Sequence, residues 1–184
     1  VNDPLASQVW VPRRPWDNFS ECFANANDGL REIADGMKIR TVGANTDTIV
    51  DNTDRAYSIA KLWQGTCLGY LALSMDKYAT ATEDSVMPTG YEDLLAWERR
   101  NIKPYEEGLI VAIRSLEQAI ERMETGSDWI TDAKFVPGQS YTRDQWRQLA
   151  HTMIARIMIY SARSPEERQA LDWNKILYHT ERGL

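Results

Sequence analysis

The stretch that decides the fold is Lys61–Tyr78, which reads KLWQGTCLGYLALSMDKY. It mixes aromatic side chains with small residues, and Gly65 and Gly69 lie four positions apart. In an α-helix that spacing puts both glycines on one face, where the backbone of a neighbouring helix can approach closely. Lys61 and Asp76 are among the polar residues that interrupt the stretch, whereas a membrane-spanning helix needs roughly 18 uninterrupted apolar residues. The stretch therefore predicts a helix that packs against two or more neighbours.

Amphipathic helices are predicted along most of the chain, because apolar residues recur at intervals of three and four. Capping patterns mark two helix starts, Thr142 to Gln145 and Ser164 to Glu167. Only a few residues connect the helix that begins at Thr142 to the helix that begins at Ser164, so we expect these two helices to be antiparallel. Gly29 lies inside the first predicted helix, where glycine destabilises a helix by about 1 kcal/mol relative to alanine. Its presence suggests that a neighbouring element packs closely there. Helices are expected over about 17–36, 54–78, 104–126, 142–160 and 164–183, with a short piece around 91–99.

The remaining segments predict an arm and several loops. Residues 1–16 contain three prolines and are expected to form an extended N-terminal arm. Residues 38–53 and 127–141 lack a helical stripe, and no segment alternates convincingly as a strand would. The predicted fold class is all-α: about five main helices with long loops, stacked as antiparallel pairs in a TPR-like α-solenoid or bundle. Residues 17–184 would form this helical-repeat domain.

Composition limits the classes of function. The chain has 184 residues with 43% hydrophobic and 26% charged residues, which is ordinary for a folded globular protein. Its net charge is −6 and its basic residues are scattered, so nucleic-acid binding is disfavoured. Cys22 and Cys67 each lie in an apolar helical segment and lack the spacing of a zinc site. The sequence allows two alternatives, in which Cys22 and Cys67 are two buried thiols or form a single disulfide with each other.

Sequence patterns for catalysis and metal binding are missing. His151 and His179 lie in separate predicted helices, without a partner at metal-ligand spacing, and are expected to be structural or surface residues. Neighbouring acidic residues such as Glu106 and Glu107 point to different faces of a helix and complement its positive end. We therefore expect no enzyme, no cofactor and no metal.

Four blocks of sequence resemble, in order, conserved helices of the SusD/RagB family. The blocks are DNFSECFANANDGLREIADG (17–36), AYSIAKLWQGTCLGYLALSMDKY (56–78), SLEQAIERME (115–124), and TRDQWRQLAHTMIARIMIYSAR with DWNKILYHTERGL (142–163 and 172–184). The family typically has an asparagine near the middle of the first block, where this chain has Asn25 and Asn27. The resemblance covers roughly residues 16–184.

This resemblance implies an outer-membrane lipoprotein at the cell surface that acts without catalysis. Such proteins capture a glycan or other nutrient for a SusC-like TonB-dependent transporter, so an oligosaccharide or peptide ligand is expected. Because family members are much longer, we expect the chain to be the helical-repeat portion of a longer protein, with the lipid anchor outside it. The alternative is a helical-repeat structural or protein-interaction module that binds another polypeptide, including a copy of itself, through an uncovered apolar face.

Aromatic residues in the predicted loops are the candidates for ligand binding. A sugar ring stacks on an aromatic face because its C–H groups are apolar and polarised, and the chain contains seven tryptophans. We select four residues in and around predicted loops: Tyr91, Trp97, Trp129 and Tyr141. The alternative is that these side chains only pack the loops onto the helices. Three other tryptophans lie on helical stripes and are expected in the core: Trp63, Trp146 and Trp173.

Overall fold

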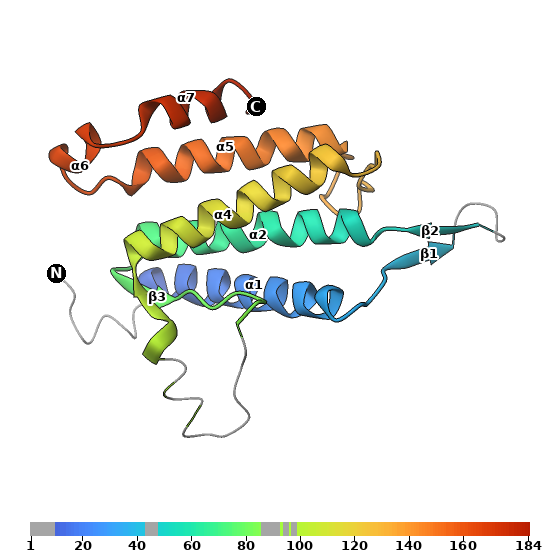
Figure 1. Ribbon diagram of the computed structural model, residues 1–184, viewed down its shortest axis with the longest axis horizontal. Helices are drawn as coiled ribbons and strands as arrows, with labels where there is room; N and C mark the ends of the chain where they lie inside the picture. Colours follow the sequence, from blue (N-terminus) through green and yellow to red (C-terminus); the bar gives the residue numbers. More distant parts are fainter. Residues whose placement is uncertain (1–9, 43–47, 86–92, 94–95, 97–98) are drawn as a thin grey trace.

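The computed structural model describes residues 10–42, 48–85, 93, 96 and 99–184. Within these residues the chain is mostly helical, which confirms the predicted all-α class (Figure 1). The helices are α1 (Trp10–Ala34), α2 (Thr53–Ser74), α4 (Tyr105–Thr125), α5 (Arg143–Ser161), α6 (Pro165–Gln169) and α7 (Trp173–Thr180). Two short antiparallel sheets pair β1 (Arg40–Val42) with β2 (Ile49–Asp51), and β3 (Lys77–Ala79) with β4 (Ile102–Pro104).

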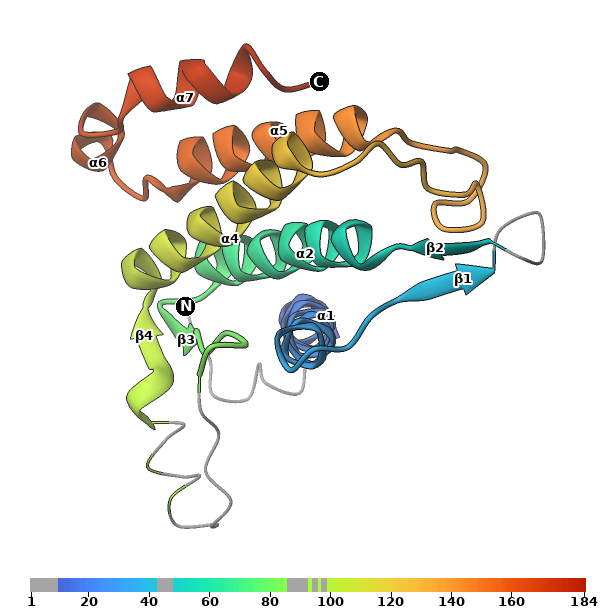
Figure 2. The ribbon, with the colours of Figure 1, turned by 45° about the vertical axis from the view of Figure 1, so that its right-hand side comes forward.

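Helix α2 lies at the centre of the helical stack. It contacts α1 and α5, while α4 runs diagonally across α2 and α5 (Figure 1). Helix α7 packs on α5 and runs antiparallel to it, as the short connection predicts. After a 45° turn of the molecule, the β1–β2 hairpin is seen to project away from the helices (Figure 2). The core therefore forms where α2, α4 and α5 meet.

The paired glycines of α2 face two different neighbours. A Cβ atom built on Gly65 would lie 2.6 Å from the carbonyl oxygen of Ala112 in α4. A Cβ atom on Gly69 would overlap the side chain of Ile157 in α5. The prediction that these glycines admit close neighbours is confirmed. The same prediction for Gly29 is wrong, because no atom lies within 4 Å of a Cβ built there.

The first helix starts earlier than predicted. Because α1 begins at Trp10, residues 10–16 are helical, and the extended arm expected there is wrong. Pro12 lies in the first turn, where a backbone N–H has no partner within the helix and proline is tolerated. The helical part of the chain thus begins before the expected boundary at residue 17. Residues 1–9 of the expected arm lie outside the described residues.

The predicted loop over 38–53 contains a hairpin instead. Strand β1 pairs antiparallel with β2, with Thr41 opposite Val50. Asn52 fixes the base of the hairpin, since its Nδ2 donates to Oγ1 of Thr41 at 2.8 Å. The β-branched residues favour strands, but each strand has only three residues and all of them are exposed. No alternation between buried and exposed positions could have revealed them.

Helix α2 ends at Ser74, before the predicted end at Tyr78. Arg163 reaches this end from a distant part of the sequence, and its Nη2 donates to the carbonyl oxygens of Ala72 and Met75, both at 2.8 Å. These carbonyl oxygens at the end of α2 therefore have hydrogen-bond partners although the helix does not continue. The chain then extends into β3, where Tyr78 is buried.

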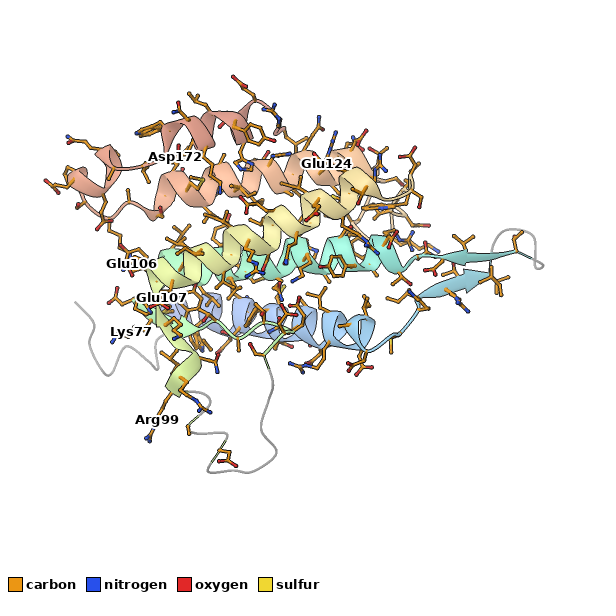
Figure 3. The ribbon with its side chains drawn as sticks, in the orientation of Figure 1. Lys77, Arg99, Glu106, Glu107, Glu124 and Asp172 are labelled. Carbon is orange, nitrogen blue, oxygen red and sulfur yellow. The ribbon has the colours of Figure 1, made fainter. Side chains whose placement is uncertain are left out.

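The predicted helix over 164–183 is divided into α6 and α7. Helix α7 has its own N-cap, because Oδ1 of Asp172 accepts a hydrogen bond from the backbone N–H of Lys175 at 2.9 Å. Figure 3 labels Asp172 at the start of α7. At the start of α5 the predicted capping box is confirmed. The N–H of Gln145 donates to Oγ1 of Thr142 at 3.3 Å, and the N–H of Thr142 donates to Oε1 of Gln145 at 2.9 Å.

The tryptophans on helical stripes differ in burial. Trp146 lies in the core between α2, α4 and α5, as predicted. The prediction is wrong for Trp63 and Trp173, which are 38% and 46% exposed. In α7, the buried residues are Ile176 and His179, so the helix packs through a narrow face that excludes Trp173. A helical stripe in the sequence marks apolar positions but does not show how many of them a neighbour covers.

Candidate functional site

The loop between α4 and α5, residues 126–142, carries two of the four predicted binding residues. Trp129 lies near its start and Tyr141 near its end. Both side chains are half-buried and pack against the core, as the alternative to ligand binding expected, yet each keeps some exposed surface. Tyr91 and Trp97 lie outside the described residues.

Hydrogen bonds tie the two limbs of this loop together. The N–H of Thr131 donates to the carbonyl oxygen of Tyr141 at 2.9 Å, and the N–H of Arg143 donates to that of Trp129 at 3.0 Å. Trp146 supports the loop from α5, since its Nε1 donates to Oγ1 of Thr131 at 3.1 Å. The rings of Tyr141 and Trp146 pack edge to face, with centroids 5.6 Å apart. The loop is therefore fixed on the core, and Trp129 and Tyr141 belong to one ordered unit.

A hollow of about 600 Å³ lies beside this loop. Trp129 and Ile130 give it an apolar side, and three charged side chains give it a polar side. Its lining residues are Asp128, Trp129, Ile130, Thr142, Arg143 and Asp144. Tyr141 does not line it directly but holds the neighbouring limb of the loop.

Arg143 organises the charged side of the hollow. Its Nη2 lies 2.9 Å from the carboxylate of Asp128 and 3.9 Å from that of Asp144, and its Nη1 donates to the carbonyl oxygen of Gly126. Its Nε is buried and has no hydrogen-bond partner in the described part of the chain. An indole face beside carboxylates and a guanidinium can stack on the apolar face of a sugar ring and also bind its hydroxyl groups.

A second hollow, of about 360 Å³, lies between the same loop and the start of α2. Its lining is mostly apolar and includes Ala56, Ile59 and Ala60 of α2 with Phe135 of the loop. Phe135 is exposed and packs edge to face on Trp146, with ring centroids 5.9 Å apart. The loop thus borders two hollows, one charged and one apolar.

Sequence reasoning selected Trp129 but missed Asp128 and Arg143. Asp128 immediately precedes the selected tryptophan, and Arg143 follows the helix cap at Thr142. A charged residue beside an aromatic one was the available signal, but such neighbours are frequent in solvated loops. Only the folded loop shows that these two charges meet.

A second polar cluster is buried between α1, α2 and the segment that follows β3. Lys61 and Glu83 are 2% and 7% exposed and form an ion pair. Gln64 donates from Nε2 to Oε2 of Glu83 and to Oδ1 of Asn27, both at 2.6 Å. Asn27 in turn donates from Nδ2 to the carbonyl oxygen of Ala81 at 2.8 Å. This cluster fastens the segment after β3 onto the two helices.

The buried ion pair suits a structural role. Burial acts to raise the pKa of Glu83, but hydrogen bonds from Lys61 and Gln64 outweigh burial and hold the pKa below its usual value. Glu83 is therefore ionised at neutral pH and neutralised by Lys61. The side-chain oxygen of Gln64, Oε1, accepts hydrogen bonds from Lys61 at 3.1 Å and from Ser115 at 2.8 Å. These groups satisfy one another inside the protein and present nothing to a substrate.

A pair of histidines joins α7 to α5. Nδ1 of His151 lies 2.8 Å from Nδ1 of His179, and both rings are buried, in agreement with a structural role. A hydrogen bond between two imidazole nitrogens needs one N–H donor and one lone pair, so both rings cannot be charged while it exists. The charged groups around the pair are Glu117 and Glu124 of α4, Arg147 of α5, and Lys175 and Arg182 in and after α7. In Figure 3, Glu124 is seen near the end of α4.

Acid is expected to weaken the attachment of α7. Burial, followed by the neighbouring His151, lowers the pKa of His179 to about 4. Because the unfolded value is about 6.5, the unfolded chain binds more protons between these pH values, and stability rises with pH there. The contribution is complete above about pH 6.5 and is lost as the pH falls toward 4, by about 2–3 kcal/mol. Urea denaturation at pH 7 and pH 4.5 measures this loss.

Other carboxylates also titrate in this range, so the His179→Leu variant serves as the control. Its stability should differ less between the two pH values than that of the parent chain. Equal pH dependence in the two proteins would contradict the role assigned to the histidine pair.

Comparisons with known proteins add no information about this site. The chain matches no protein-family model, no curated protein and no solved structure. Across the described residues, no helix has the length and apolar character needed to cross a bilayer. In the same residues, no three or more histidine, cysteine or acidic side chains are grouped so that they could hold a metal ion.

Proposed function

We propose that the chain is a non-catalytic binding module of the SusD type, which captures a glycan or another nutrient for a SusC-like TonB-dependent transporter. In this proposal the protein works at the outer-membrane surface. The four sequence blocks that resemble the family support it, and so does the mostly helical architecture. Asn27, one of the two asparagines in the first block, lies at the centre of the buried polar cluster.

A TPR-like arrangement of helix pairs belongs to the same proposal. Helices α5 and α7 form one antiparallel pair, joined by the short helix α6. Helices α1 and α2 form another pair, joined by the β1–β2 hairpin, and α4 lies between the pairs on one face (Figure 1). Stacked pairs of this kind leave their connecting loops free to bind ligands.

The observation that carries the proposal is the hollow beside the α4–α5 loop. Trp129 provides a ring face there, and Asp128 and Arg143 provide charged hydrogen-bonding groups within the same space. Binding sites for polar ligands combine an apolar surface for contact area with a few placed polar groups for orientation. An oligosaccharide matches this combination because each ring has an apolar face and a rim of hydroxyl groups.

Trp129→Ala is expected to weaken oligosaccharide binding by about tenfold or more, because a half-buried aromatic residue in a binding hollow contributes strongly to affinity. Isothermal titration calorimetry against a panel of oligosaccharides measures the change. Trp63→Ala is the matched control, because Trp63 is exposed on α2 and does not line the hollow. Equal affinities of the two variants, or no binding of any oligosaccharide or peptide by the parent chain, would overturn the proposal.

A second candidate, a helical-repeat protein-interaction module, is favoured by exposed apolar residues near the last helix. These residues are Ile159, Tyr160, Trp173, Leu177 and Tyr178. Large apolar side chains that are exposed near one another are candidates for contact with other polypeptides. Light scattering on the calorimetry samples distinguishes the two: a concentration-dependent increase in mass that Leu177→Lys abolishes would favour the interaction module.

A further inference from the structure

Helices α1 and α2 pack antiparallel in a register that two contacts define. The rings of Phe19 and Tyr70 stack with centroids 5.1 Å apart and planes 5° apart. Further along, Nε2 of Gln64 donates to Oδ1 of Asn27 at 2.6 Å. Moving inward from the stacked rings by three residues on each helix gives position 22 on α1 and position 67 on α2. Both positions are cysteines, and the register places them at the same level of the helix pair.

The two thiols belong to one apolar cluster but differ in environment. Cys22 and Cys67 are free cysteines, and Cys22 packs against the apolar cluster that contains Cys67. A hydrogen bond from the Cys67 thiol is the main influence on the pKa of Cys22. Cys67 is 2% exposed, in an apolar cluster with Phe23, Leu68 and Leu71. Cys22 is half-buried at the edge of that cluster. A small reagent from solvent can therefore reach Cys22 first.

This hydrogen bond also gives the two thiols different pKa values. As the acceptor, the sulfur of Cys22 has its pKa lowered to about 7, although burial acts in the opposite direction. As the donor, Cys67 has its pKa raised by the same hydrogen bond, and burial raises it further. The accessible cysteine is thus the one with thiolate character, and thiolate is the reactive form.

We propose that Cys22 and Cys67 form a two-thiol oxidation site, in which a peroxide oxidises Cys22 and Cys67 then closes a disulfide that ties α1 to α2. The inference rests on the register of the two helices and on the packing of both cysteines in one apolar cluster. It is independent of the proposed binding function, and it assigns a role to two residues that lie outside the α4–α5 loop.

The reaction balances with hydrogen peroxide as the oxidant. The Cys22 thiolate attacks one peroxide oxygen, the O–O bond breaks, and hydroxide leaves, so Cys22 becomes a sulfenic acid. Hydroxide takes the proton of the Cys67 thiol and becomes water. The Cys67 sulfur then attacks the Cys22 sulfur, the S–O bond breaks, and the departing oxygen leaves as a second water after protonation. Two thiols and one peroxide thus give one disulfide and two waters.

The test treats the fully reduced chain with hydrogen peroxide and counts free thiols by alkylation and mass spectrometry. We expect both thiols to disappear together, with a peptide pair that joins residues 22 and 67 and no increase in mass by light scattering. The melting temperature should rise, because the bridge restricts the unfolded chain. The rate should increase through about pH 7, following the pKa of Cys22.

Two variants assign the roles. In Cys67→Ser, Cys22 should stop at the sulfenic acid and react with a 1,3-dione probe. In Cys22→Ser, Cys67 should keep its thiol for at least about ten times longer than Cys22 does in the parent chain. The proposal is overturned if the parent chain keeps both thiols under conditions that oxidise free glutathione, if its disulfides form between molecules, or if Cys67 in the Cys22→Ser variant reacts as fast as Cys22. Each readout measures thiols rather than oligosaccharide binding, so it fails or succeeds independently of the proposed function.

Discussion

Lys61→Ala is expected to lower the free energy of unfolding by about 3–5 kcal/mol, because it leaves the buried carboxylate of Glu83 without its counter-charge. Lys61 is 2% exposed, so water cannot replace its ammonium group cheaply. The variant also removes one of the hydrogen bonds that hold Gln64 in place. Urea denaturation at pH 7 measures the loss.

Lys103→Ala provides the matched control for the ion pair. Lys103 lies 4.0 Å from Glu107, and both side chains are well exposed, at 42% and 58%. An exposed pair of this kind contributes at most about 1 kcal/mol. Replacing both buried partners, in Lys61→Met with Glu83→Leu, should recover much of the loss, since no isolated charge remains buried. A Lys61→Ala variant no less stable than Lys103→Ala would show that Glu83 finds another partner.

The same cluster illustrates what the sequence could not reveal. Lys61 and Gln64 were visible as polar residues within an otherwise apolar helix, and they argued against a membrane span. Their burial depends on Glu83, which belongs to an irregular segment that returns to the helix after β3. Helical periodicity describes one element at a time, so it identifies α2 but not the loop residue that neutralises its face.

Local signals predicted local structure well. The capping box at Thr142 and Gln145 and the close contacts of Gly65 and Gly69 are present as expected. Strands β1 to β4 escaped prediction because each has three residues, too few for a period of two to become evident. Helix ends set by distant residues were missed for a related reason, as with Arg163 at the end of α2.

For the candidate site, the sequence indicated a residue type to look for but not which residues come together in space. An aromatic residue in a loop drew attention to Trp129, and the structure places it beside a hollow. The charges that complete the hollow come from the start of the loop, at Asp128, and from the first residue of α5, Arg143, and they meet only when the two limbs of the loop pair. The histidine pair follows the same rule, because His151 and His179 come from different helices, 28 residues apart in sequence.

Gly65→Val is expected to destabilise the fold by about 3 kcal/mol or more, because there is no room for a side chain between α2 and α4. A Cβ atom at this position would lie 2.6 Å from the carbonyl oxygen of Ala112 and 2.7 Å from Cγ of Leu116. The first of these atoms is backbone, so relief would require the two helices to separate. Separation would open the core between α2, α4 and α5, where Leu116 is fully buried. Urea denaturation followed by circular dichroism measures the loss.

Substitutions at two other glycines distinguish steric crowding from the change in helix propensity that follows whenever glycine is replaced in a helix. Gly29→Ala should stabilise the chain by up to about 1 kcal/mol, because alanine favours helix and nothing lies near its Cβ. Gly69→Ala should be destabilising, but Ile157→Val should relieve part of the loss, since the Cδ1 atom that meets the new methyl group is absent from valine. If Gly65→Val and Gly29→Ala changed stability by similar amounts, α2 and α4 would not be in the close contact on which this packing depends.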